Sequence, residues 1–242
     1  MKKFFLLFAV LFVTPSVSSA FPGADVDVSV GFEMPKPSGS VTLGGASQDV
    51  VSALNLGSGN DFIARIDINH SVPILPNIYI HHLPVEVTGN PAAGGHAEMK
   101  IQQDDVGLYY NLPFIREATD EVLGIKIGVN ARIVNLRAEE KDIPTIPEDS
   151  KNFSTVIPMG YVGLDLKPIH LISISAEIKM LPLGASSLTE YSAELRVHPI
   201  WSLYLGAGYF NYTVKIDPSL APGAPQANFT LAGPYFVVGL EL

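Results

Sequence analysis

The chain has 242 residues, a formal net charge of −9 and no cysteine. The lack of cysteine excludes a disulfide scaffold, a thiolate metal site, a cysteine nucleophile and a lipid anchor on an N-terminal cysteine. The acidic balance argues against a nucleic-acid partner, because phosphate contacts depend on clustered Lys and Arg.

The first twenty residues have the order of a secretory signal peptide. Lys2 and Lys3 precede an unbroken apolar run from Phe4 to Val13, and small residues follow at positions 18–20. The apolar run is too short to cross a bilayer as a helix, but it has the length of a signal-peptide core. We expect residues 1–20 to be cleaved, which leaves residues 21–242 as one exported domain.

Apolar and polar residues then alternate in one segment after another. Along residues 125–133, Ile, Val and Ala occupy the odd positions, whereas Lys, Gly, Asn and Arg occupy the even ones. Such a period of two is typical of β-strands with one apolar and one polar face. The expected strands, of which only the third has a mixed phase, are 26–32, 64–69, 78–87, 105–112, 125–133, 161–166, 172–179, 193–198, 203–210 and 235–242.

The connections between these segments alternate in length. Short Pro-containing turns are expected after residues 69, 166 and 197, with a slightly longer one over 112–122. The longer connections are rich in Gly, Pro, Ser, Asn and acidic residues, and cover 34–60, 88–103, 139–154, 182–190 and 215–228. Short turns at one rim and long loops at the other are typical of an outer-membrane barrel, with the short turns in the periplasm.

These patterns predict an all-β fold, an up-and-down antiparallel transmembrane β-barrel of about ten strands. The mean hydropathy of +0.27, despite 16% charged residues, fits lipid-facing strands. A soluble sandwich or barrel with the apolar phase inward is the alternative. Aromatic residues near strand ends favour the membrane, as interface girdles would, and are Phe32, Phe62, Tyr110, Phe114, Trp201, Tyr209 and Phe236.

The polar phase then faces the lumen. Charges of both signs on neighbouring strands predict cross-strand ion pairs that fill a narrow interior. The predicted lumen network is Asp27, Arg65, Asp67, Asp105, Lys126, Arg132, Asp165, Glu177, Lys179, Glu194, Arg196 and Glu241.

Two polar clusters were considered as catalytic or metal sites. Asp104 and Asp105 with His96 are expected on the outer side, where an Asp/His hydrolytic site of an outer-membrane protease or lipid-modifying enzyme would form. His81 and His82 with Glu86 resemble metal ligands. The chain contains no HExxH-type spacing or Gly-rich phosphate loop, so we expect no catalytic residues, no metal and no cofactor.

Four stretches resemble a family of Gram-negative outer-membrane proteins of this length. They are Phe21-Pro22, Leu75–Tyr79, Val106–Phe114 and Gly233–Leu242. The resemblance implies the location and the barrel fold, and it carries no catalytic residue. Such barrels usually end in an aromatic residue that the assembly machinery recognises, whereas Leu242 stands here. The predicted C-terminal assembly signal is Phe236, Val238, Leu240 and Leu242.

The sequence thus predicts a monomeric protein of the cell outer membrane with a side-chain-filled lumen and a structural or surface-interaction role. The alternatives are a narrow diffusion channel for small solutes and, less favoured, an outer-membrane enzyme. The expected partners are outer-membrane lipids, lipopolysaccharide and, during biogenesis, the barrel assembly machinery.

Overall fold

The computed structural model describes residues 23–43, 46–72, 74–90, 95–141, 149–184, 186–200, 202–217 and 226–242. The expected signal peptide at 1–20 lies outside these ranges. The strands are β1 (Ala24–Glu33), β2 (Lys36–Leu43), β3 (Ala46–Asp49), β4 (Asp61–His70), β5 (Asn77–His82), β6 (Val85–Gly89), β7 (His96–Asn111), β8 (Leu123–Lys141), β9 (Asp149–Ile169), β10 (Ile172–Leu183), β11 (Ser186–Ile200), β12 (Leu203–Ile216) and β13 (Ala227–Glu241).

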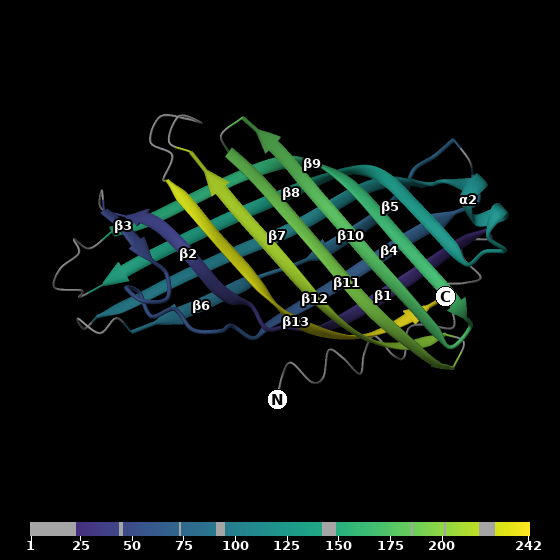
Figure 1. Ribbon diagram of the computed structural model, residues 1–242, viewed down its shortest axis with the longest axis horizontal. Coiled ribbons are helices and arrows are strands. Elements are labelled where there is room, and N and C mark those ends of the chain that lie inside the picture. Colours follow the sequence, from purple (N-terminus) through teal and green to yellow (C-terminus); the bar gives the residue numbers. More distant parts are fainter. Residues whose placement is uncertain are drawn as a thin grey trace.

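Ten of these strands close into an antiparallel barrel in the order β1-β4-β5-β7-β8-β9-β10-β11-β12-β13. The pairing of β1 with β13, from Asp27↔Glu241 to Glu33↔Tyr235, closes the ring. Figure 1 shows the tilted strands wrapping around the long axis of the molecule. The predicted ten-stranded antiparallel barrel is therefore confirmed, and nine of the ten predicted segments lie on its strands, whereas the third, 78–87, begins on β5 and ends on β6.

The two ends of the barrel differ. At the end carrying α2 (Pro113–Ala118), here called the base, short connections join the strands. At the opposite end, here called the head, β2 and β3 extend the sheet from β13, and β6 pairs with β7. Among the described residues, no helix is long and apolar enough to cross a membrane.

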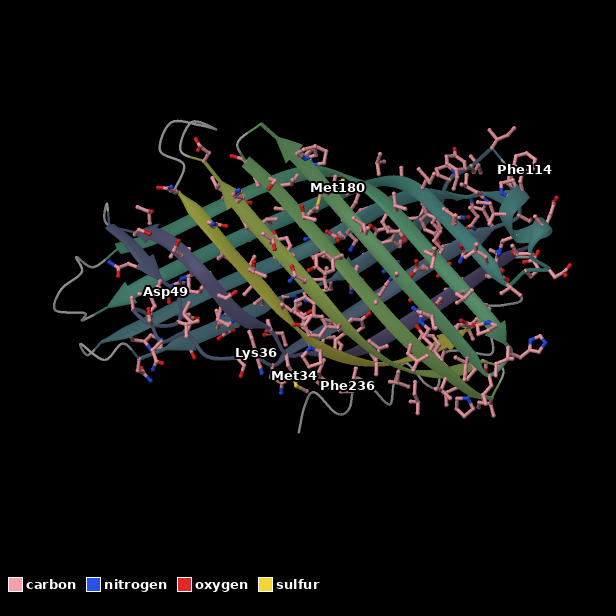
Figure 2. The ribbon with its side chains drawn as sticks, in the orientation of Figure 1. Met34, Lys36, Asp49, Phe114, Met180 and Phe236 are labelled. Carbon is pink, nitrogen blue, oxygen red and sulfur yellow. The ribbon has the colours of Figure 1, made fainter. Side chains whose placement is uncertain are left out.

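An apolar band surrounds the half of the barrel nearer the base. Figure 2 shows Phe236 and Met180 on opposite sides of the barrel, and both side chains are about half exposed. A band of outward apolar side chains is the surface that hydrocarbon requires. It consists of Phe32, Met34, Ile66, Ile68, Ile78, Ile80, Val106, Leu108, Tyr110, Ile127, Val129, Ile133, Val156, Val162, Leu164, Ile174, Ile178, Met180, Tyr191, Leu195, Val197, Leu205, Tyr209 and Phe236.

The aromatic residues expected to form girdles lie at the edges of this band or on the base. Phe32 packs edge to face on Phe62, with 5.9 Å between ring centroids, and Phe236 is the register partner of Phe32 on β13. Phe114 is on α2 at the base and is 80% exposed. Trp201 lies outside the described residues.

Strand β7 shows where the apolar band ends. Near the base its outward residues are apolar, as at Val106 and Leu108, and its inward residues include buried Asp105. Towards the head the two faces exchange character, because Lys100 points outward whereas Met99 and its inward neighbours are buried and apolar. We call this change the polarity inversion; it marks the head-side edge of the apolar band.

The polarity inversion explains why the sequence predicts loops where the structure has strands. The stretches 34–60, 88–103, 139–154, 182–190 and 215–228 are predicted as long connections, but strands occupy much of the first four, and in the fifth β12 continues to Ile216 and β13 begins at Ala227 on either side of residues that the structure does not describe. Their outward residues are polar because this part of the barrel lies beyond the apolar band. A strand of this composition has the same sequence features as a loop. The mixed phase of 78–87 has the same cause, since β5 ends below the inversion and β6 begins above it.

The head has an apolar core instead of a polar lumen. It is made from β6 to β13 and from the segment after β3, and its buried members are Val50, Leu54, Leu56, Val85, Val87, Ala97, Met99, Ile101, Val134, Met159, Leu188, Phe210, Tyr212, Val214, Ala227, Phe229 and Leu231. The turn after β3 is fixed by Asp49, whose Oδ1 accepts bonds from the backbone N–H groups of Val51 (3.0 Å) and Ser52 (2.7 Å). These bonds position Val50 and Leu54 in the core.

Candidate functional site: the barrel interior

Three tyrosines fill the middle of the barrel half that carries the apolar band. Tyr79, Tyr109 and Tyr161 are at most 1% exposed, and their ring centroids are 5.2–6.1 Å apart. Each hydroxyl has a buried or half-buried acceptor: Asn130 for Tyr79 (2.9 Å) and Asn69 for Tyr109 (2.8 Å). Large rings with satisfied hydroxyls pack a cross-section without leaving a polar atom unpaired.

The small residues of the polar phase make room for these rings. A Cβ added at Gly107 would lie 2.0 Å from the Tyr79 ring, and one at Gly128 would lie 2.1 Å from the Leu108 carbonyl oxygen. Glycine is therefore required at both positions by close approach of a ring or a backbone. The glycines that the sequence placed in the polar phase thus help to pack the interior.

Arg65 lies against the tyrosine layer and joins two carboxylates. Its guanidinium donates to Asp67 (Nε to Oδ2, 2.6 Å) and to Glu177 (2.8 Å), and its Cζ is 4.7 Å from the centroid of Tyr79. Tyr161 donates to the other oxygen of Glu177 at 2.9 Å. The planar five-donor guanidinium suits this arrangement, because a lysine could not contact both carboxylates in such a fork.

A second cluster lies closer to the head. Asp105 is fully buried and accepts two bonds of 2.7 Å from Arg132 and one of 2.8 Å from Lys179. Glu190 pairs with both cations from the other side. All four charges balance, as burial in a low-dielectric interior demands.

The charges nearest the base are less completely buried. Arg196 donates to Asp27 at 2.8 Å and pairs with Glu194, while Lys126 pairs with Asp165 at 2.8 Å. A polar hollow of about 560 Å³ opens here, and both ion pairs contribute residues to its wall.

The structure places all twelve predicted lumen residues in the interior or on the wall of the base hollow. Eleven of them form the ion pairs above, and Glu241 lies 3.4 Å from His198. Two buried carboxylates were missed. Glu33 follows the segment 26–32, and Glu190 was assigned to a loop, but both have the same parity as the inward residues of their strands.

The residues considered for a hydrolytic site do not meet. Asp104 points outward and bonds His82 Nδ1 at 2.6 Å, whereas Asp105 points inward to Arg132. His96 lies at the head end of β7, and its nearest bonded partner is Asn90 at 3.4 Å. Adjacent residues on a strand face opposite sides, so the Asp104, Asp105 and His96 arrangement considered for a hydrolytic site does not form.

The residues considered for metal ligation are also separated. His81 faces the interior, His82 faces outward, and Glu86 pairs with Lys100 on the head exterior at 2.7 Å. Within the ranges that the structure describes, no group of three His, Cys, Asp or Glu side chains is arranged to hold a metal ion.

In its half nearer the base, the C-terminal strand carries apolar residues on the outer face. Phe236 is 51% exposed, and Val238 and Leu240 follow at alternate positions with Leu242. The strand is bonded on both sides, to β1 and to β12.

No family model and no curated protein matches the chain. Among solved structures, similarity is found to the outer-membrane protease OmpT of Escherichia coli, with 12% identity, a TM-score of 0.47 and coverage of 91% of this chain and 96% of that chain. The translocator domain of the autotransporter NalP of Neisseria meningitidis has 11% identity, a TM-score of 0.46, and coverage of 100% and 96%. The attachment invasion locus protein Ail of Yersinia pestis has 8% identity, a TM-score of 0.39, and coverage of 90% and 98%.

Proposed function

We propose that this protein is a non-enzymatic outer-membrane barrel that presents a rigid head at the cell surface. In this proposal residues 1–20 direct export and are removed, and the apolar band lies among outer-membrane lipids. The polarity inversion carries the proposal. A barrel with an apolar exterior over one half and an apolar core in the other half suits a chain that is half embedded and half in water.

The interior supports a closed lumen. The tyrosine layer and the cluster of Asp105, Arg132, Lys179 and Glu190 lie between the base hollow and the apolar core of the head. Displacing such paired charges for a solute would leave buried charges uncompensated. A structural or surface-interaction role therefore fits better than transport.

A narrow channel is the second candidate, favoured by the base hollow of about 560 Å³. Planar-bilayer conductance of the refolded protein distinguishes the two. We expect no discrete conductance steps from the wild type. The triple variant Y79A/Y109A/Y161A serves as a sensitivity control, because it removes the rings that fill the cross-section. Steps in the wild type would overturn the closed-lumen proposal.

Orientation and location have separate tests. The chain has no cysteine, so single cysteines can be placed at exposed Lys215 on the head and at exposed Glu117 on α2. A membrane-impermeant maleimide applied to intact cells should label K215C and spare E117C. The reverse pattern would contradict the orientation. Recovery of the protein in the soluble periplasm, with no heat-modifiable gel migration, would contradict the location.

The proposed surroundings follow from the same surface. The apolar band meets outer-membrane lipids, and the polar exterior that begins at its head-side edge meets lipopolysaccharide. We propose a monomer inserted by the barrel assembly machinery, for which the outward C-terminal residues Phe236, Val238 and Leu240 supply the recognition signal. Substituting Phe236 with Asn should slow membrane insertion in vivo, whereas substituting exposed Asn228 with Asp should leave it unchanged.

A further inference from the structure

A polar sheet face on β2, β11, β12 and β13 adjoins the apolar band on its head side. Hydroxyl side chains cross this face in one row, because Thr189 pairs with Thr213, Thr213 with Thr230, and Thr230 with Ser38. The Oγ1 atoms of Thr213 and Thr230 are 3.1 Å apart. Since neighbouring strands lie about 4.8 Å apart, the row presents hydroxyl groups at regular intervals over four strands.

These side chains point away from the barrel. The residues that alternate with them on β12 and β13, such as Tyr212 and Phe229, are buried in the apolar core of the head, and adjacent residues of a strand face opposite sides. Thr213 and Thr230 are half-buried among their strand neighbours, whereas Ser38 is exposed. A hydroxyl has one donor and two acceptor lone pairs, so the row can form further hydrogen bonds with a partner outside the head.

The charges on this face are positive. Between the apolar band and the row of Lys215, the outward side chains of the four strands include Lys36 and Lys215 and no carboxylate. The exterior of β6 and β7 carries three carboxylates instead, Glu86, Glu98 and Asp104. The head therefore has one outer face that suits a phosphorylated partner and another that repels it.

Lys36 lies at the edge of the apolar band. It follows the band residue Met34 by two positions on the same face, which is about 7 Å along the strand. Figure 2 shows Lys36, Met34 and Phe236 along one side of the barrel, with Lys36 nearest the head. In a glycolipid the phosphates adjoin the acyl chains and the outer sugars follow, and lysine binds phosphate as a point charge. The face has the same order, from apolar to cationic to hydroxyl-rich.

We propose that this face binds lipopolysaccharide of the surrounding leaflet. The acyl chains lie on the band, a phosphate pairs with Lys36, and the core sugars form hydrogen bonds with the row of Thr189, Thr213, Thr230 and Ser38. The proposal rests on the proposed function, since these strands meet lipopolysaccharide only when the head is at the cell surface. Continuity with the band favours a lipid-anchored glycan over a free one, because one molecule then covers both the apolar and the polar surface.

The experiment titrates two probes into the full-length protein, refolded in a non-ionic detergent without divalent cations. One probe is lipopolysaccharide that carries the inner core, and the other is lipid A, which has the phosphates and lacks the core sugars. Heat-dependent gel migration gives the unfolding midpoint, and its rise with probe concentration gives an apparent affinity. K36Q should weaken the binding of both probes by about fivefold. K100Q, on the exterior of β7, should leave both affinities unchanged.

The double variant T213V/T230V tests the contact with the sugars. It removes two hydroxyls of the row and keeps two residues that favour strands. It should lower the affinity for core-bearing lipopolysaccharide by about fivefold and leave the affinity for lipid A unchanged. Equal affinities of K36Q and K100Q would overturn the proposal. No loss in T213V/T230V would also overturn it, and so would an equal loss for both probes, since the effect would then be structural.

The titration in detergent does not depend on the orientation of the barrel in the cell. It is therefore separate from the maleimide labelling of K215C and E117C. Labelling as expected, with unchanged affinities in K36Q and T213V/T230V, would refute this inference alone. The reverse labelling would refute the proposed function, whatever the affinities measured in detergent.

Discussion

Replacing Asp105 with Asn should destabilise the barrel strongly although the side-chain shape is kept. Asp105 is fully buried and accepts three charge-assisted bonds of 2.7–2.8 Å, two from Arg132 and one from Lys179. Without its charge, two buried cations face Glu190 alone. Removing one partner of a buried ion pair typically costs about 3–5 kcal/mol, and we expect D105N to lose this much unfolding free energy.

The neighbouring position provides the matched control. Asp104 points outward, and its pair with His82 is about half exposed, so D104N should cost less than about 1 kcal/mol. D105N/K179M removes one charge of each sign and restores the balance. It should therefore be less destabilised than the sum of the two single variants, by about 1–3 kcal/mol.

The assay is urea-dependent folding in lipid vesicles, followed by the fluorescence of the single tryptophan and by gel migration. Equal stabilities of D105N and D104N would refute the argument from burial. Strict additivity in the double variant would refute the argument from charge balance.

Three further substitutions test the band, the packing and the head. L108R places a cation on the lipid-facing side of β7 and should lower the unfolding free energy in vesicles by about 2–4 kcal/mol. Q102R, on the head exterior of the same strand, should lower it by less than about 0.5 kcal/mol. Similar losses for the two variants would contradict the position of the polarity inversion. G107A forces a methyl against a buried tyrosine ring and should cost about 1–3 kcal/mol. The control is G160A, whose added Cβ has no neighbour closer than 3.7 Å; equal urea midpoints would refute the packing account. Backbone and hydroxyl hydrogen bonds lower the pKa of Asp49. The ionised carboxylate therefore stabilises its turn fully at pH values above the pKa that the carboxyl has in the unfolded chain. This stabilisation is lost as the pH falls through the lowered pKa. Amide protection in that turn, corrected for the intrinsic pH dependence of exchange, should therefore fall at acidic pH in the wild type, and D49A, which lacks the acceptor of the Val51 and Ser52 N–H groups and should be unprotected at every pH, provides the comparison.

The half of the barrel nearer the base could be predicted because its polarity pattern is one-sided. Along β8, Ile125, Ile127 and Val129 face outward and Lys126 and Arg132 face inward, so the alternation is strong. A period of two gives strand identity and facing together. This is why the interior charges were assigned from the sequence and why the barrel was recognised.

The head could not be predicted by the same rule. Beyond the inversion, inward residues are apolar and outward residues polar, and Gly, Ser, Asn and Pro are frequent. These residues favour loops when a segment is considered alone. Pairing with a long neighbour keeps them in strands, as β2 is held by β13 through Val41↔Ala227 and its neighbours. The deciding information is tertiary.

The two buried carboxylates Glu33 and Glu190 show a similar limit. The parity of Glu33 and Glu190 would have placed both in the interior, had the strands been extended by a few residues. No sequence pattern indicates that Glu190 is paired and Glu33 is not, because this depends on which cation each strand brings opposite to it. His81 and His82 likewise acquire different surroundings only when β5 is placed between β4 and β7.

The polarity inversion also couples folding to insertion. In water, a barrel formed by this chain would expose its apolar band. A barrel with the opposite facing of every strand would bury that band, but it would also bury the polar exterior of the head. Neither arrangement therefore suits water along the whole barrel. A shift of the whole molecule along the membrane normal is opposed from both sides, because Asp104 and His82 would enter hydrocarbon or Ile133 and Val156 would leave it. The level at which the long strands exchange their polar and apolar faces therefore sets how deep the barrel can sit in a membrane.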